Sequence, residues 1–184
     1  MRTIILKEKD FEDGIYCGEE DLSNIEGNLE IEKSGCCGFE GDISAKGDIS
    51  AEGYIFVKGD ISAEGYIFVK GDISAKGDIF AKGDISANGY ILANGDISAK
   101  GDISAKGGIS AEGYISAEGD ISAKGDISAK GDIFAKGDIS AKGYIFTKGY
   151  ISAGGYISCE KCRTPLASEL GKDQQKLKNW AKLK

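Results

Sequence analysis

The chain has 184 residues, enough for one domain, with 41% hydrophobic residues, 29% charged residues and a formal net charge of −7. It contains 28 glycines, one proline and no histidine, so it lacks the commonest general base and the commonest metal ligand. No apolar run long enough to cross a membrane is present, and the apolar stretch near the start is too short for a signal peptide, so we expect a cytoplasmic protein without a membrane span.

Residues 1–34 are predicted to cap the N-terminal end of the repeat structure that follows them. The stretches MRTIIL and GNLEIEKS have the composition of strands. Ile25 and Ile31 are in step with the isoleucines of the repeat, so we expect the repeat fold to begin before residue 41. The first 40 residues carry 4 basic and 11 acidic side chains, which makes this end strongly acidic.

A six-residue repeat occupies residues 41–160 without insertion or deletion. Each of its twenty hexads begins with Gly and has Ile at the third position. The second residue is Asp or Tyr except at Gly108, and the fourth is Ser, Phe or Leu. The fifth is usually Ala, and the sixth is mostly Lys or Glu. Alternate side chains of an extended chain share a face, so Gly, Ile and Ala point one way and the polar and aromatic residues point the other. An α-helix cannot keep one face with this period.

Stacked hexads can bury isoleucines that a single hexad leaves exposed. The sequence therefore predicts an all-β protein, a single-chain β-solenoid of hexapeptide repeats over residues 35–160, between an N-terminal cap at 1–34 and a basic C-terminal segment at 161–184. Each buried Ile stabilises this core by about 2 kcal/mol before entropy is counted. The glycines are expected at corners, where the backbone needs either a positive φ or the absence of a Cβ.

The number of hexads in one coil is open between three and two. Bulky fourth-position residues such as Phe56 and Phe68 recur two hexads apart, which favours a two-sided coil with stacked aromatic rings. However, the stretch 47–70 is itself a duplicated pair of hexads, and duplication alone produces that spacing. We therefore favour three hexads per coil and a triangular rod.

Large apolar side chains at outward positions crowd one half of the repeat. Exposed aromatic clusters mark binding surfaces, although aromatic residues are also good strand formers that a surface tolerates. The candidate partner surface consists of Tyr54, Phe56, Tyr66, Phe68, Phe80, Tyr90 and Leu92.

Cysteines provide the sharpest local motif. Cys159 and Cys162 form a CxxC half-site for zinc, and Cys36 and Cys37 could complete a site of four thiolates. The two pairs flank the repeat, so a single rod cannot close this site, whereas two rods stacked end to end can. The repeat places Cys37 at an Ile position and Cys159 at an Ala position, where both would act as small buried hydrophobes. We expect no cofactor.

The unbroken hexads, with the recurring phrases GDI and GYI, resemble two families of β-helix proteins. One comprises the hexapeptide-repeat acyltransferases, whose β-helix is left-handed. The other comprises the bactofilins, polymer-forming bacterial cytoskeletal proteins with a right-handed triangular β-helix, and the Gly two residues before the core aliphatic is more similar to these. The resemblance covers residues 41–160. The acyltransferases use a catalytic His, which this chain lacks, so the resemblance implies a structural protein rather than an enzyme.

Residues 161–184 form a basic segment with 7 basic and 2 acidic side chains. Thr164-Pro165 is a plausible helix start. The apolar residues of the helix predicted to follow would lie near one face, and they are Leu166, Leu170, Leu177 and Trp180. We expect this helix to cover the last coil; the alternative is a tail that binds a partner or a membrane surface.

These features predict a non-enzymatic structural or scaffold protein that acts through a rigid surface and assembles end to end, since its two ends carry opposite charge. The alternative is an acidic inhibitor that imitates nucleic acid and occupies a nucleic-acid-binding protein. In both cases the partner is a protein, either another chain or a second copy in a homo-oligomer. Direct nucleic-acid binding is not expected, because the lysines are interleaved with acids.

Overall fold

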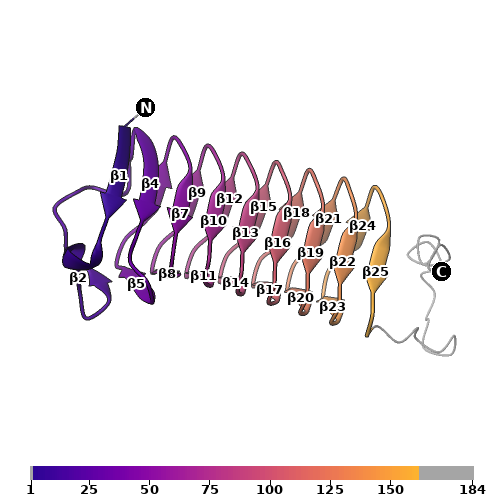
Figure 1. Cartoon of the computed structure of the whole chain (residues 1–184). Helices are drawn as coiled ribbons and strands as arrows, with labels where there is room; N and C mark the ends of the chain where they lie inside the picture. The colour runs from indigo at the N-terminus through magenta and orange to yellow at the C-terminus, as the bar shows by residue number, and fades with distance from the viewer. Residues whose placement is uncertain (1, 162–184) are drawn as a thin grey trace, which may run out of the picture.

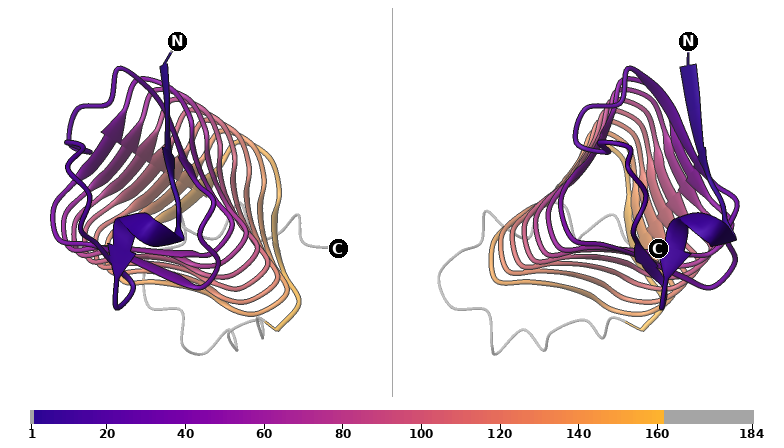
Figure 2. Two further views of the ribbon diagram at one scale, coloured as in Figure 1. Left: turned by 60° about the vertical axis from the view of Figure 1, so that its left-hand side comes forward. Right: turned by 90° about the vertical axis from the view of Figure 1, so that its left-hand side faces the viewer.

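A computed structural model describes residues 2–161 of the chain. They wind into a three-sided rod, in which the chain passes from one side to the next and advances by one strand per coil (Figures 1 and 2). The sides are three sheets of nine, nine and seven strands, parallel except for one N-terminal hairpin. The prediction of an all-β, three-sided solenoid is therefore confirmed, and the two-sided alternative is wrong.

We call the outer surfaces of the three sheets face A, face B and face C. Sheet A contains β1 (Arg2–Leu6), β4 (Gly27–Ile31), β7 (Ile49–Ala51), β10 (Ile67–Val69), β13 (Ile85–Ala87), β16 (Ile103–Ala105), β19 (Ile121–Ala123), β22 (Ile139–Ala141) and β25 (Ile157–Cys159). Sheet B contains β2 (Phe11–Glu12), β3 (Ile15–Tyr16), β5 (Cys36–Phe39), β8 (Tyr54–Val57), β11 (Ile73–Ala75), β14 (Ile91–Ala93), β17 (Ile109–Ala111), β20 (Ile127–Ala129) and β23 (Ile145–Thr147). Sheet C contains β6 (Ile43–Ala45), β9 (Ile61–Ala63), β12 (Ile79–Ala81), β15 (Ile97–Ala99), β18 (Ile115–Ala117), β21 (Ile133–Ala135) and β24 (Ile151–Ala153).

One coil of the repeat contains three hexads, so equivalent hexad positions stack directly. Ile97, for example, lies between Ile79 and Ile115 in sheet C. Backbone hydrogen bonds between coils continue around the corners, where the N–H of Gly101 donates to the carbonyl oxygen of Gly83 at 3.1 Å. The rod is therefore bonded along its whole perimeter and not only along its flat sides.

The core is a stack of isoleucines with alanine beside them. Every hexad isoleucine from Ile43 to Ile139 is buried, as is every fifth-position residue from Ala45 to Ala141. In the last coil that the structure describes, Ile145, Ile151 and Ile157 are only half-buried. The alternation seen in the sequence thus places the apolar face inside, as predicted.

The corner glycines from Gly47 onward are required because no Cβ fits, and not because of a positive φ. Among the described residues only Asp13, Gly14 and Gly35 have positive φ, and none of them belongs to a hexad. A Cβ built on Gly101 would lie 1.8 Å from the Oδ1 atom of Asp84, one coil earlier. The second-position side chain of one coil thus fills the space beneath the glycine of the next.

Second-position aspartates join neighbouring coils through a repeated hydrogen bond. The Oδ1 atom of Asp84 accepts the backbone N–H of Asp102 at 2.9 Å, Asp102 accepts that of Asp120 at 2.8 Å, and Asp120 accepts that of Asp138 at 2.7 Å. Hydrogen bonds to ionised groups are stronger than neutral ones, so these contacts stiffen the corners.

Sixth-position glutamates pair with lysines one coil later. Glu52 contacts Lys70 at 2.7 Å, and Glu112 contacts Lys130 at the same distance. Both members of each pair are about half exposed, so an individual pair contributes little to stability. Their effect is to neutralise charge along the edges of the rod.

The N-terminal residues cover the first coil. Strand β1 pairs with β4, the 3-10 helix η1 (Glu8–Asp10) follows, and the β2–β3 hairpin extends sheet B (Figure 2). The rings of Phe11, Tyr16 and Phe39 pack with centroids 5.7 to 5.8 Å apart. This aromatic cluster closes the N-terminal end of the core.

The predicted register of Ile25 and Ile31 is wrong by two residues. Ile31 pairs with Ala51 and Ile25 bridges Ala45, so both occupy alanine positions, and Leu29 takes the isoleucine position. The corner at residues 32–35 contains the two extra residues that cause the shift. A shift of two preserves the inward direction of these side chains, so the core continues into the cap.

The longer corner also holds the buried lysine of the cap. Lys33 is 9% exposed, and its Nζ atom lies 2.6 Å from Oε1 of Glu8 and 5.7 Å from the centre of the Phe11 ring. A buried ammonium group is tolerated when it is paired in this way. Gly35, with φ of +84°, completes the corner.

Residues 162–184 lie outside the described part of the chain. They include Cys162, Leu166, Leu170, Leu177 and Trp180 and the whole helix predicted after Thr164. In residues 2–161 no helix has the length and hydropathy that crossing a bilayer requires.

Candidate interaction faces

The seven residues of the candidate partner surface are all exposed, but they occupy three faces. Tyr54, Phe56, Tyr90 and Leu92 lie on face B, Tyr66 and Phe68 on face A, and Phe80 on face C. Their positions follow from the three hexads of each coil, because residues two hexads apart are on different sides. A partner that contacts one face therefore meets only part of this set.

Face B displays the densest group of these side chains. Tyr54 and Phe56 project from β8, Leu92 projects from β14, and Tyr90 directly precedes β14. Strand β11 runs between them, with Ser74 paired to both Phe56 and Leu92. Two strand spacings, about 9.6 Å, separate the two apolar pairs. The result is an apolar ridge, a polar strand and a second apolar ridge.

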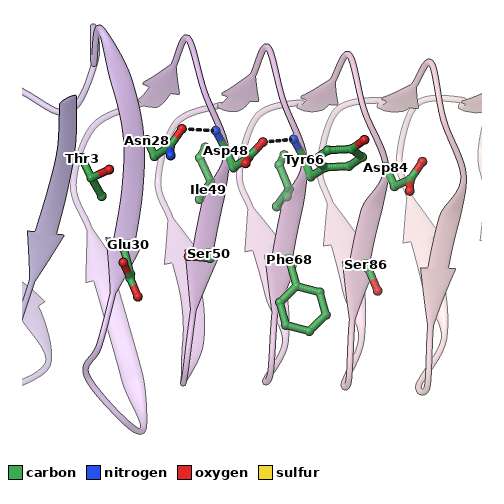
Figure 3. A pocket seen from close by; sticks show the side chains of 11 residues that line it. Thr3, Asn28, Glu30, Asp48, Ile49, Ser50, Tyr66, Phe68, Asp84 and Ser86 are labelled. Carbon is green, nitrogen blue, oxygen red and sulfur yellow. Dashed lines mark hydrogen bonds between the residues drawn. The ribbon is translucent and has the colours of Figure 1, made fainter. Parts of the chain in front are cut away.

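Face A carries a shallow groove of about 430 Å³ near its N-terminal end (Figure 3). Figure 3 shows two rows of side chains across the strands. The first row contains Asn28, Asp48, Tyr66 and Asp84, and the second contains Glu30, Ser50, Phe68 and Ser86. The Oδ1 atom of Asn28 accepts the N–H of Asp48 at 3.0 Å, and that of Asp48 accepts the N–H of Tyr66 at 2.9 Å.

Face C separates its aromatic residues more widely. Phe80 lies between Ser62 and Ser98 on neighbouring strands. Further along, Tyr114 follows Asp96 in the column of second-position residues, and the N–H of Tyr114 donates to Oδ1 of Asp96 at 2.9 Å. The nearby Asp96 carboxylate raises the pKa of the Tyr114 hydroxyl, which keeps the phenol protonated.

Sequence reasoning missed exposed aromatic residues in the second half of the rod. They stand at the same second and fourth positions of the hexad, which was the available signal. These residues are Tyr114, Phe134, Tyr144, Phe146, Tyr150 and Tyr156. Apolar side chains are therefore distributed along the whole rod, and their distribution over faces matters more than the half in which they lie.

The cysteines do not assemble into one site within the described residues. Cys36 and Cys37 lie in β5, whereas Cys159 lies in β25 at the other end of the rod (Figure 1). Cys37 pairs with Ile55 and is buried, as predicted. Cys159 pairs with Ala141 as predicted, but it is only half-buried, because it lies in the last strand that the structure describes. Burial raises the pKa of the Cys37 thiol to about 11, so it stays protonated at neutral pH. Residues 2–161 contain no cluster of three or more His, Cys, Asp or Glu side chains suited to a metal ion.

Comparison with protein families finds one match. The model described as the FapA (Flagellar Assembly Protein A) beta solenoid domain matches residues 55–167. The match covers more than half of the chain and includes most of the regular coils. Comparisons with curated proteins and with solved structures find no match.

Proposed function

The chain belongs to the family of FapA β-solenoid domains, and from this premise we propose that it is a non-catalytic scaffold that holds protein partners during flagellar assembly. The observation that supports this role most strongly is that exposed aromatic side chains are held in fixed positions on a rod whose coils are hydrogen-bonded around the whole perimeter. Protein interfaces are enriched in aromatic residues, and a rigid display lowers the entropy that binding loses.

Face B is the main partner surface in this proposal, and face A is the second. Face B combines the Tyr54–Phe56 and Tyr90–Leu92 pairs, and face A has the Tyr66–Phe68 pair. The carboxylates and lysines along the edges form the polar rim that such interfaces have. The scaffold is proposed to act in the cytoplasm, as the composition of the sequence suggests.

Converting aromatic hexads to the commoner GDIS form is expected to remove binding and leave the fold intact. A Tyr54→Asp/Phe56→Ser variant changes face B, and a Tyr66→Asp/Phe68→Ser variant changes face A. Asp at these positions is expected to accept the N–H one coil later, as Asp84 does for Asp102. Thermal melts should therefore stay close to wild type, while cross-linking to flagellar assembly proteins should fall for the variant whose face is used.

Ser98→Ala is the matched control, because it alters face C without changing an exposed apolar residue. It should retain both the fold and the cross-links. Two folded variants that cross-link as strongly as wild type would show that these aromatic residues do not form the partner surface.

Self-association through the ends is the second part of the proposal. Strand β1 is the outermost strand of sheet A at the N-terminal end, and β4 is its one paired neighbour among the described residues, so its outer edge is available to a strand of a second copy. The half-buried Ile145, Ile151 and Ile157 lie at the opposite end of the described residues. The first 40 residues are acidic and residues 161–184 are basic, so a head-to-tail contact brings together opposite charges. Such a contact does not close, and it leads to chains of rods.

Added salt is expected to weaken this self-association. Exposed charges are screened over about 8 Å at physiological ionic strength, so sedimentation should show larger species at low salt than at high salt. A chain ending at Glu160 lacks the whole basic segment 161–184, so its self-association should no longer depend on salt. A full-length protein that stays monomeric at every concentration and ionic strength would exclude end-to-end assembly.

The nucleic-acid-mimic hypothesis has weaker support. An imitation of the phosphate backbone requires rows of unpaired carboxylates. Glu52 and Glu112 are instead paired with lysines one coil later, and lysine columns run beside the aspartates. The edges of the rod are consequently mixed in charge.

A further inference from the structure

Glu30 occupies an unusual place on face A. It pairs with Ser50, which in turn pairs with Phe68, so the three side chains stand in one row across β4, β7 and β10 (Figure 3). The glutamates at the corners contact lysines, as Glu52 does with Lys70. Glu30 is exposed and has no hydrogen-bond or ion-pair partner among residues 2–161.

The space between Glu30 and Phe68 matches the size of an organic cation. Two strand spacings, about 9.6 Å, separate their backbones, and the small Ser50 lies between them. A guanidinium group above Ser50 can therefore donate hydrogen bonds to the Glu30 carboxylate on one side and stack on the Phe68 ring on the other. Arginine suits this arrangement, because its planar group stacks on aromatic rings and binds a carboxylate with two hydrogen bonds.

The charges around this space also favour a cation. The groove is lined by the carboxylates of Glu30, Asp48 and Asp84, and by no lysine or arginine. Asp48 and Asp84 each use Oδ1 to accept a backbone N–H, which leaves Oδ2 and the negative charge toward solvent. Tyr66 adds a second aromatic ring between these two aspartates (Figure 3).

The described parts of faces B and C do not repeat this arrangement. Phe56 on face B lies between Gly38 and Ser74, and Phe80 on face C lies between Ser62 and Ser98. Neither ring has a carboxylate in its own row. Face A thus differs from the other two faces in chemistry as well as in the number of aromatic residues.

We propose that the face A groove binds an arginine side chain carried by an extended basic segment of a protein partner. The guanidinium group sits above Ser50, paired with Glu30 and stacked on Phe68, while further basic residues meet Asp48 and Asp84. This inference rests on the proposed scaffold function and names the chemistry of the partner at one face. A basic segment of another copy of this chain and a small free cation are alternatives that the test separates.

The test measures fluorescence anisotropy of a labelled peptide of alternating Arg and Gly with the full-length protein. The Glu30→Ser variant is expected to bind at least about fivefold more weakly, because a charge-assisted hydrogen bond is lost. The Phe68→Ser variant is expected to bind about threefold more weakly through loss of the cation–π contact. Both changes restore the serine that is common in this row, so circular dichroism should show an unchanged fold.

Two matched variants separate this site from general attraction to an acidic chain. Glu160→Ser removes the same charge about 34 Å away, at seven strand spacings, and Phe80→Ser removes a ring from face C. Both should bind the peptide within about twofold of wild type, since exposed charges at that distance are screened. A peptide with citrulline in place of arginine should not bind, and a lysine peptide should bind more weakly than the arginine peptide.

Equal binding by wild type and Glu30→Ser, or equal losses for Glu30→Ser and Glu160→Ser, would overturn the proposal. Binding of free arginine as tight as that of the peptide would assign the groove to a small cation. A peptide of residues 162–184 that binds more tightly than the arginine peptide would assign it to self-association. The cross-linking experiment on faces A and B is independent of these outcomes, so the scaffold function can hold while this inference fails.

Discussion

An Ile97→Asp variant is expected to lose the cooperative melting transition of the wild type. Ile97 is fully buried between Ile79 and Ile115, and the surrounding core offers only isoleucine and alanine side chains. A carboxylate there has no partner, so its burial costs several kcal/mol or forces the coil to open. We expect a loss of more than about 4 kcal/mol, which is at the upper end for single substitutions.

The matched control for this variant is Ser98→Ala, one residue along the same strand. Ser98 points outward between Phe80 and Ser116, so its replacement should change the free energy of unfolding by no more than about 0.5 kcal/mol. Circular dichroism melts of the two variants give the comparison. Similar melting temperatures would mean that the inside and outside of the strand have been assigned wrongly.

The inward and outward positions of each hexad could be predicted because side chains alternate along a strand. The number of hexads in a coil does not follow from this alternation and required a second pattern in the sequence. The spacing of two hexads between bulky fourth-position residues favoured a coil of two hexads, which is wrong. The charges contained the better signal, since Glu52 is followed three hexads later by Lys70 but two hexads later by Glu64. A coil of two hexads would have stacked Glu52 on Glu64, whereas a coil of three places a lysine next to each of them.

The register of the cap could not be derived from the hexad pattern. The corner at residues 32–35 is two residues longer than the others, and its buried Lys33 is paired with Glu8, which is 25 residues earlier. That pairing depends on how the cap folds back over the first coil. The Lys33–Glu8 contact joins segments that are distant in the sequence, so no local sequence pattern predicts it.

The same shift explains why Glu30 was not recognised as a candidate site residue. Counted in hexads, Glu30 falls at a second position, beside the aspartates that bond the next coil. Its pairing with Ser50 instead places it at a fourth position, in the row that contains Phe68. The alternation within the hexad was enough to predict that the aromatic residues are exposed. Assigning them to the three faces required the number of hexads in a coil.

Substitution of a corner glycine is expected to destabilise the rod, though less than a charge in the core. A Cβ at Gly101 would lie 1.8 Å from Oδ1 of Asp84 and 3.1 Å from the backbone nitrogen of Asp84. The Asp84 side chain cannot move away without giving up the N–H of Asp102. Gly101→Ala should therefore cost about 1 to 3 kcal/mol, the range for overpacked sites, and lower the melting temperature accordingly.

Gly41→Ala tests whether this cost comes from the coil beneath and not from glycine itself. Gly41 begins the same hexad motif, but nothing lies within 4 Å of a Cβ built there, and its φ is not in the left-handed region. Its replacement should be neutral or slightly stabilising, because alanine reduces the entropy of the unfolded chain. The double variant Asp84→Ala/Gly101→Ala should cost less than the sum of its single variants, since the carboxylate that meets the new methyl group is gone. Equal losses for Gly41→Ala and Gly101→Ala would instead place the requirement for glycine in the backbone conformation of the corner, and the stacking of Asp84 under the next coil would not explain the repeat.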